Sequence, residues 1–183
     1  MVRPRRLEDD ELLARIVTAL EQRTERTPWS LADVAPAAGI GPAALIKRFG
    51  SKAGLLQALT RRWVDLIPDS DPIDGADARS QLRAYVAREF GAESAPGAIH
   101  ALSEVVGELS DPALAELLAE GWARQARWLG RLLAGMGLPN LHDPVVGGEM
   151  LLDALHGSLF RSAVGLEQTS PLITLDRFLE MWK

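Results

Sequence analysis

The side chains that most often carry out catalysis are sparse in this chain. It has no cysteine among its 183 residues, which excludes disulfides, thiolate metal sites and cysteine nucleophiles. Its histidines, His100, His142 and His156, include no pair at the four-residue spacing of a helical metal site. Asp153 lies three residues before His156, and on a helix this spacing more often produces a local hydrogen bond than a catalytic pair. Gly147-Gly148 lacks the preceding strand and the adjacent lysine of a phosphate-binding loop. We therefore predict no catalytic residue, no metal site and no cofactor.

The distribution of charge indicates a different chemistry, the binding of a polyanion. The formal net charge is −5, but residues 1–68 contain eleven Lys/Arg against eight Asp/Glu. Residues 69–183 contain nine against seventeen. A basic first third beside an acidic remainder suggests that only the first part meets nucleic acid. Lys47, Arg48 and Lys52 are the cations that would do so, and ordinary surface charge is the alternative interpretation.

Capping signals around these cations predict two short helices joined by a tight turn. Ser30 stands at an N-cap position, with Asp33 in the first turn that follows. Gly39 ends this helix, Pro42 begins the next one and Gly50 ends it. Small apolar residues would hold the two helices at a steep angle: Val34, Ala35, Ala38, Ile40, Leu45 and Phe49. Such a pair leaves the outer face of the second helix free to enter a major groove.

The run from Ser30 to Leu56 resembles the helix-turn-helix of the tetracycline-repressor (TetR) family. The matching positions are Val34-Ala35, Ala38-Gly39-Ile40, Leu45, Phe49, Ser51-Lys52 and Leu55. The resemblance extends over about residues 8–60, and it implies an all-α protein with a helical ligand-binding and dimerisation part. The chain departs from the family pattern where Thr and Tyr give way to Ala44 and Ile46. Arg48 replaces a histidine and Gly41 a serine, so the recognition helix is poor in hydrogen-bonding side chains.

From this alignment we predict the residues that contact DNA: Ser30, Gly41, Pro42, Ala43, Ala44, Ile46, Lys47, Arg48 and Lys52. Lys47 is the clearest polar reader of bases, and Ala43, Ala44 and Ile46 would touch thymine methyl groups. Ser30 and Lys52 would meet phosphates at helix N-termini. The basic arm at residues 3–6 would lie in a minor groove or remain a solvated tail.

The remainder of the chain also carries helical periodicity, and no alternating pattern long enough for a sheet. We predict about nine helices in total, including a fourth at Ser51 with one apolar face (Leu55, Leu56, Leu59, Trp63 and Leu66). Later helices are expected near 77–92, 96–109, 112–136, 144–165 and 172–182. The polar, proline-containing segment 68–75 is the best linker. We therefore divide the chain into a DNA-binding domain, residues 1–68, and an effector-binding and dimerisation domain, residues 69–183.

Large or polar groups on otherwise apolar helical faces mark candidates for an effector pocket. They are His100, Trp122, Gln125, Trp128, Met136, Met150 and His156. The alternative interpretation of each is an ordinary core residue. An effector that fits these side chains would be apolar or aromatic. Arg124, Arg127 and Arg131 recur at helical spacing behind Glu120, which predicts an exposed ion-paired face rather than an anion site.

The last two helices carry more apolar residues than one small bundle needs. The interface candidates are Leu151, Leu155, Leu159, Phe178 and Trp182. In the TetR family the corresponding helices form a four-helix interface in a homodimer. A two-fold dimer would present two recognition helices to palindromic double-stranded operator DNA.

The hypothesis favoured by these features is a DNA-binding transcriptional regulator, a repressor released by a small-molecule effector. No apolar run is long enough to span a bilayer and no signal peptide follows the basic start, so a cytoplasmic protein is expected. Two alternatives stay open. One is a ligand-binding or protein-interaction module whose degenerate helix-turn-helix no longer reads DNA, favoured by Ala44, Ile46 and the net charge of −5. The other is an all-helical enzyme built from distant residues.

Overall fold

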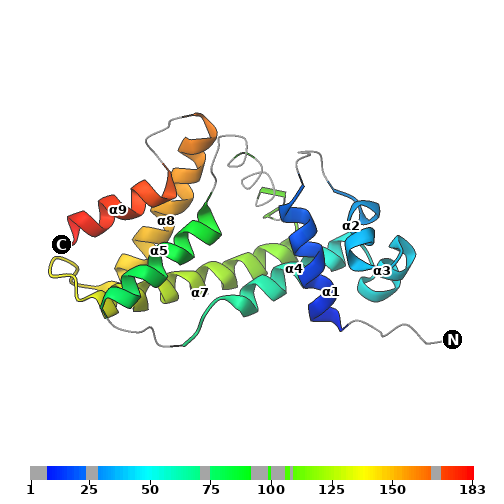
Figure 1. The fold of residues 1–183 in the computed structure, drawn as a ribbon, viewed down its shortest axis with the longest axis horizontal. Helices are drawn as coiled ribbons and strands as arrows, with labels where there is room; N and C mark the ends of the chain where they lie inside the picture. The colour runs from blue at the N-terminus through cyan, green and yellow to red at the C-terminus, as the bar shows by residue number, and fades with distance from the viewer. Residues whose placement is uncertain are drawn as a thin grey trace. The chain divides into compact units, whose positions relative to one another are not determined.

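The structure is a computed structural model of the whole chain. It describes residues 8–23, 29–70, 75–91, 99, 106–107, 109–165 and 170–183. Regular structure in these residues is entirely helical, with eight helices named in Figure 1 and no strand. The predicted all-α class is therefore confirmed. The ninth helix, expected at 96–109, lies largely outside the described residues. The chain forms two compact units, Met1–Leu66 and Ile67–Lys183, which are described separately below.

The N-terminal unit packs four helices around a small core. They are α1 (Asp9–Glu21), α2 (Leu31–Ala38), α3 (Pro42–Phe49) and α4 (Lys52–Leu66). The core contains Leu12, Leu13, Ile16, Val34, Ala35, Ala38, Leu45, Leu55 and Leu59. Those of α1 recur at helical spacing, so one face of that helix covers α2 and α4. This core fixes the angle at which α3 is presented.

Local capping chemistry sets the ends of α2 and α3 as predicted. The carboxylate of Asp33 accepts hydrogen bonds from the backbone N–H of Ser30 at 2.7 Å and from its hydroxyl at 2.9 Å. These two bonds, backbone first, lower the pKa of Asp33 from its ordinary value. Gly39 ends α2 at φ +66°, a left-handed conformation that suits glycine. Pro36 lies within α2, and the helix continues past it to Ala38.

The buried face of α4 differs from the predicted one in its second half. Leu66 is 58% exposed, whereas Val64 is fully buried. Leu55 and Leu59 belong to the core of the N-terminal unit, but Val64 does not. The prediction for Leu66 was wrong because it assumed that one buried apolar face continues along the whole of α4. The core of the N-terminal unit, which buries that face, extends along α4 only as far as Leu59.

The C-terminal unit is a bundle built around two long helices. Its helices are α5 (Ala76–Phe90), α7 (Pro112–Met136), α8 (Pro144–Ala163) and α9 (Pro171–Met181). Each of the last three begins with proline after a capping side chain. Helix α7 has the predicted bounds, and α8 ends two residues earlier than expected. Helix α7 packs against α5 and α8, and α9 against α5 and α8 (Figure 1).

Glycines bring the backbones of α7 and α8 into direct contact. A Cβ atom on Gly148 would lie 2.3 Å from the carbonyl oxygen of Ala126 and 2.6 Å from the nitrogen of Gly130. A Cβ atom on Gly130 would lie 2.8 Å from the carbonyl oxygen of Pro144. No side chain fits at either position without moving a backbone, so this crossing sets the distance between the helices that frame the bundle.

Candidate nucleic-acid interface

Helix α3 has a buried face and a largely apolar outer face. Leu45 is fully buried in the core of the N-terminal unit, and Phe49 packs partly against it. The exposed side chains are those of Pro42, Ala43, Ala44, Ile46 and Lys47. Ile46 is 48% exposed. The outer face therefore combines small apolar groups with one ammonium group.

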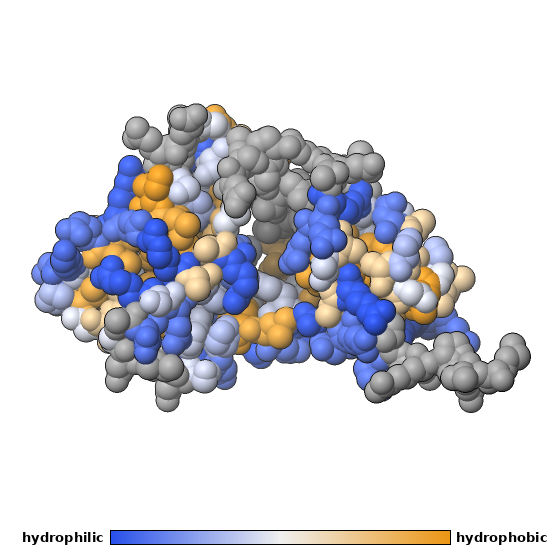
Figure 2. All heavy atoms as spheres, viewed as in Figure 1, coloured by the Kyte–Doolittle hydropathy of each residue, from blue (hydrophilic) through white to orange (hydrophobic). Residues whose placement is uncertain are grey.

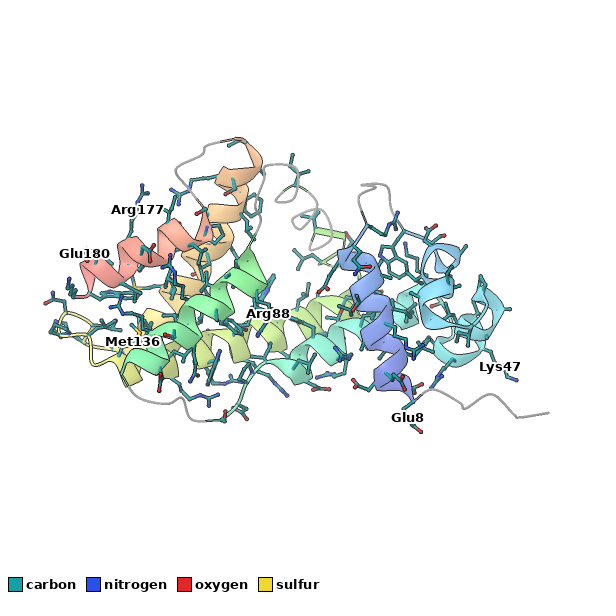
Figure 3. The ribbon with its side chains drawn as sticks, in the orientation of Figure 1. Glu8, Lys47, Arg88, Met136, Arg177 and Glu180 are labelled. Atoms are coloured by element: carbon teal, nitrogen blue, oxygen red, sulfur yellow. The ribbon has the colours of Figure 1, made fainter. Side chains whose placement is uncertain are left out.

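The three basic residues predicted to contact DNA have different surroundings. Lys47 points away from the rest of the N-terminal unit (Figure 3), and no ion pair of its ammonium group is found among the described residues. Arg48 forms an ion pair with Asp9 of α1, and its side chain is only 21% exposed. It is held against α1 rather than presented on the outer face.

Lys52 and Ser30 lie at helix N-termini, but each already has an intramolecular contact. The Lys52 ammonium group donates a hydrogen bond to the backbone carbonyl of Trp29 and lies 4.4 Å from the centre of its ring. The Ser30 hydroxyl is used by Asp33, as described above. Both side chains remain exposed at the ends of α4 and α2. Gly41 is the exposed N-cap residue of α3. The arm at residues 3–6 lies outside the described residues.

Comparison with known proteins agrees with this geometry. Residues 28–59 match the family model for bacterial regulatory proteins of the TetR family, a segment that begins just before α2 and ends within α4. No curated protein matches the chain in sequence.

Two solved structures share the fold over nearly the whole chain. A transcriptional regulator from Rhodococcus sp. Rha1 has a TM-score of 0.63 and 19% identity, with 96% of this chain and 94% of that chain covered. A protein from Rhodococcus sp. assigned to the TetR family of transcriptional regulators has a TM-score of 0.59 and 21% identity, with 94% of each chain covered. The chain carries a TetR-family DNA-binding domain.

In the C-terminal unit, three of the predicted effector residues lie along the packing of α5, α7 and α8. The ring of His156 makes edge contacts with Trp122, at 5.4 Å between centroids, and with Phe90, at 5.3 Å. Burial, the largest effect, lowers the pKa of His156, although Asp153 and the carbonyl of Leu152 act in the opposite direction. A neutral imidazole edged by two aromatic rings results.

About one helical turn from the contacts of Trp122, Phe90 and His156, two buried polar side chains lie between α5 and α7: Tyr85 and Gln125. Tyr85 is 4% exposed and Gln125 2% exposed. Burial raises the pKa of the Tyr85 hydroxyl far above its usual value, and the nearby Gln125 side chain offsets only part of this effect. The hydroxyl has no hydrogen-bond partner of good geometry among the described residues. A buried hydroxyl without a hydrogen bond lowers the stability of the fold unless a bound molecule supplies the missing hydrogen-bond partner.

The other predicted effector residues do not join this group. Trp128 is buried in the core of the unit, and its indole nitrogen has no acceptor among the described residues. Met136 is the last residue of α7 (Figure 3), and Met150 is exposed on α8. His100 lies outside the described residues. The contribution of Tyr85 and Phe90 was missed because the sequence alone does not say which residues of α5 face Gln125 and His156.

The predicted arginine stripe of α7 is only partly a solvated face. Arg124 pairs with Glu120 at 2.8 Å, as its four-residue spacing indicated. Arg131 instead donates hydrogen bonds to the carbonyl of Pro68 at 3.3 Å and to Asp69 at 3.0 Å. The hydrogen bond from Arg131 lowers the pKa of Asp69. Arg131 thus ties α7 to the segment at the start of the C-terminal unit.

Most of the predicted dimer residues are buried within the single chain. Leu151, Leu155, Leu159 and Trp182 are each at most 7% exposed, and Phe178 is partly exposed and contacts the ring of Trp182. Their side chains pack within the bundle and leave little area for a second copy. The dimer interface stays a prediction, and the outward faces of the same helices are described next.

Those outward faces carry a row of exposed apolar side chains. On α8 and at its C-cap they are Val146, Met150, Phe160 and Val164, here called the α8 stripe, spaced along one face with Asp153 and Gly157 between them. On α9, Ile173 and Met181 are exposed two turns apart. Figure 2 shows apolar surface among polar surface at the α8–α9 end of the C-terminal unit.

Among the described residues, no helix is long and apolar enough to cross a bilayer. Within the same residues, no group of three or more acidic, histidine or cysteine side chains is arranged to hold a metal ion.

Proposed function

We propose that this chain is a DNA-binding transcriptional regulator of the TetR type, a dimeric repressor that binds palindromic operator DNA and releases it when a small molecule binds its C-terminal unit. The observation that carries the proposal is the outer face of α3. Small exposed residues there allow a helix backbone to approach base edges closely, and the flanking core holds the helix rigidly. A bacterial regulator of this kind would act in the cytoplasm, where the chromosome lies.

In this proposal α3 enters the major groove, with Lys47 as its polar contact. The N-termini of α2 and α4, where Ser30 and Lys52 are exposed, would then face phosphates. Lys52 would exchange its contact with Trp29 for a phosphate contact. Because several cations would replace condensed counterions, operator affinity should fall steeply as salt is added.

The α8 stripe is the proposed surface for the homodimer. Phe160 and Val164 are 59% and 73% exposed, and an aromatic residue flanked by aliphatic ones is typical of the centre of an interface. A two-fold axis through this surface would relate two recognition helices, which a palindrome with half-sites about 34–36 Å apart requires.

The effector is proposed to bind beside Tyr85 and Gln125, with Trp122, Phe90 and His156 as aromatic walls. A neutral aromatic molecule with one hydrogen-bond acceptor could accept a hydrogen bond from the Tyr85 hydroxyl without burying a charge. Such a ligand releases DNA only if it binds better to the protomer arrangement that does not fit the operator. No chemical conversion of the effector is proposed.

Selection from random duplex DNA tests this function. The purified protein is incubated with a random library at low salt, the bound fraction is sequenced, and the affinity of the enriched site is measured at several salt concentrations. We expect an enriched palindrome. The Lys47→Ala variant should bind it more weakly and should lower the slope of the salt dependence by about one ion, or relax one base position.

Glu116→Ala, which removes an exposed charge on α7, serves as the matched control and should leave the salt slope unchanged. No enrichment at low salt would contradict the proposal and would favour the ligand-binding module with a degenerate helix-turn-helix.

A further inference from the structure

We infer that this regulator reads its operator mainly through the methyl groups of thymine, with Lys47 as a single hydrogen-bonding contact to guanine. The inference rests on the proposed function and specifies the operator: a half-site rich in A·T pairs whose thymines face α3, beside one G·C pair.

The first argument is the inventory of groups on the outer face of α3. The side chains of Pro42, Ala43, Ala44 and Ile46 contain no donor and no acceptor. Discrimination of bases by hydrogen bonds in the major groove depends on amide, guanidinium, carboxylate, hydroxyl or ammonium groups at the right positions. Of the residues on this face, Lys47 alone carries such a group.

The second argument is that the neighbouring cation is engaged elsewhere. Arg48 would be the strongest reader of guanine, because its fork can bind two acceptors at once. Its side chain lies instead against α1, where it pairs with Asp9 and is largely covered. The polar chemistry available to a base edge is thereby reduced to a single ammonium group, whose compact charge suits the acceptors of guanine.

The third argument is what remains for the apolar side chains to recognise. The C5 methyl group of thymine is the one apolar group that a base pair displays in the major groove. Ile46 is 48% exposed, so it can still lose water on contact with such a methyl. Ala43 and Ala44 add short side chains that let the helix backbone come close to the bases. An operator of other composition would leave these groups against polar edges.

The test replaces thymine by uracil, which keeps base pairing and removes only the C5 methyl. The probe is the operator enriched by selection, resynthesised with deoxyuridine at one thymine at a time, and the dissociation constant is measured at fixed salt. At each contacted thymine we expect binding to weaken roughly fourfold, the factor for one methyl-sized apolar group. Deoxyuridine in the flanks, beyond the half-sites, should have no effect.

Variants then assign the contact. Ile46→Ala should lose the preference for thymine over uracil at one position and keep it at the others. Leu66→Ala, which removes another exposed apolar side chain from the same unit, is the matched control and should keep every preference. In Lys47→Met, replacement of guanine by 7-deazaguanine at the predicted G·C pair should no longer weaken binding.

The outcomes separate this inference from the proposed function. If no duplex is enriched, the regulator does not read DNA and both are overturned. If an operator is enriched but uracil substitution changes affinity by less than about twofold at every half-site position, DNA reading stands and the methyl inference is overturned. The uracil series uses the unaltered protein, so it does not depend on whether a variant folds.

Discussion

At the scale of single residues, the acidic start of α1 neutralises part of the basic face that the composition suggested. Asp9 pairs with Arg48, and Asp10 pairs with Arg62 at 2.8 Å. These arginines therefore help to hold α3 and α4 against α1. A positive net charge for residues 1–68 overstates the cations that remain for DNA.

We expect Arg48→Met to affect folding slightly and operator binding less than Lys47→Met does. Since Asp9 is 63% exposed, the pair should contribute at most about 1 kcal/mol to the free energy of unfolding. A double-mutant cycle with Asp9→Asn, followed by chemical denaturation, measures that coupling. If Arg48→Met weakened operator binding more than Lys47→Met, Arg48 would have to leave Asp9 and enter the groove.

Burial of His156 makes stability depend on pH in a defined direction. Its pKa in the fold lies below the usual 6.5, chiefly because burial disfavours the charged form. The unfolded chain therefore takes up a proton more readily than the folded one as pH falls through about 6.5. Stability should decrease below that pH and stay constant above it.

Replacement of His156 by Phe should remove this contribution to the pH dependence, measured as the melting temperature between pH 5 and 8. The exposed His142 provides the control, and His142→Gln should keep the wild-type profile. An unchanged profile for His156→Phe would mean that other groups cause the acid destabilisation.

At the scale of elements, the crossing of α7 and α8 is the part of the bundle least tolerant of added volume. Gly148→Ala would place its methyl against the backbone of Ala126 and Gly130, so we expect a loss of about 1–3 kcal/mol in the free energy of unfolding. Gly157→Ala lies on the same helix with open space around it within the chain, and should gain roughly 0.5–1 kcal/mol. Because Gly157 lies on the face of the α8 stripe, this gain is expected at protein concentrations where the dimer has dissociated.

Chemical denaturation of both variants, with the oligomeric state checked in parallel, measures this difference. A neutral Gly148→Ala would show that the two helices can separate at little cost. It would also weaken the view of this crossing as a rigid frame.

Elements defined by local chemistry could be predicted from the sequence. Ser30, Gly39 and Pro42 set helix ends through caps and backbone preferences that involve only neighbouring residues. The bounds of α7 followed in the same way from Pro112 and from the glycine after Met136.

What could not be predicted depends on which elements meet. Helix α8 is apolar on two sides, so periodicity did not say that Leu151 and Leu155 face the bundle while Phe160 faces outward. The pairing of Arg48 with Asp9, 39 residues away, and the approach of Tyr85 to Gln125 likewise depend on tertiary packing.

At the scale of the whole molecule, the α8 stripe should decide whether two recognition helices act together. We expect Phe160→Glu to weaken the dimer at least tenfold, since it would replace the aromatic residue of the stripe by a charge. Operator affinity should fall with it, because each monomer would hold a single half-site. Analytical ultracentrifugation over a range of protein concentrations measures the dimer, and binding to a full and a half palindrome measures the consequence.

Leu66→Glu is the matched control, since it puts the same charge at an exposed apolar position outside the stripe. A Phe160→Glu protein that remained dimeric at all concentrations would exclude the α8 stripe as the interface.

The edge contact between Trp122 and His156 has an optical consequence. An excited indole loses its fluorescence to a protonated imidazole in contact with it, and far less to a neutral one. The light emitted by Trp122, obtained as the difference between the wild type and Trp122→Phe, would therefore dim as His156 takes up a proton. It would also change when a molecule inserts between the two rings. The regulator thus carries its own unlabelled reporter, with which a library of compounds could be screened for effectors before any operator is known.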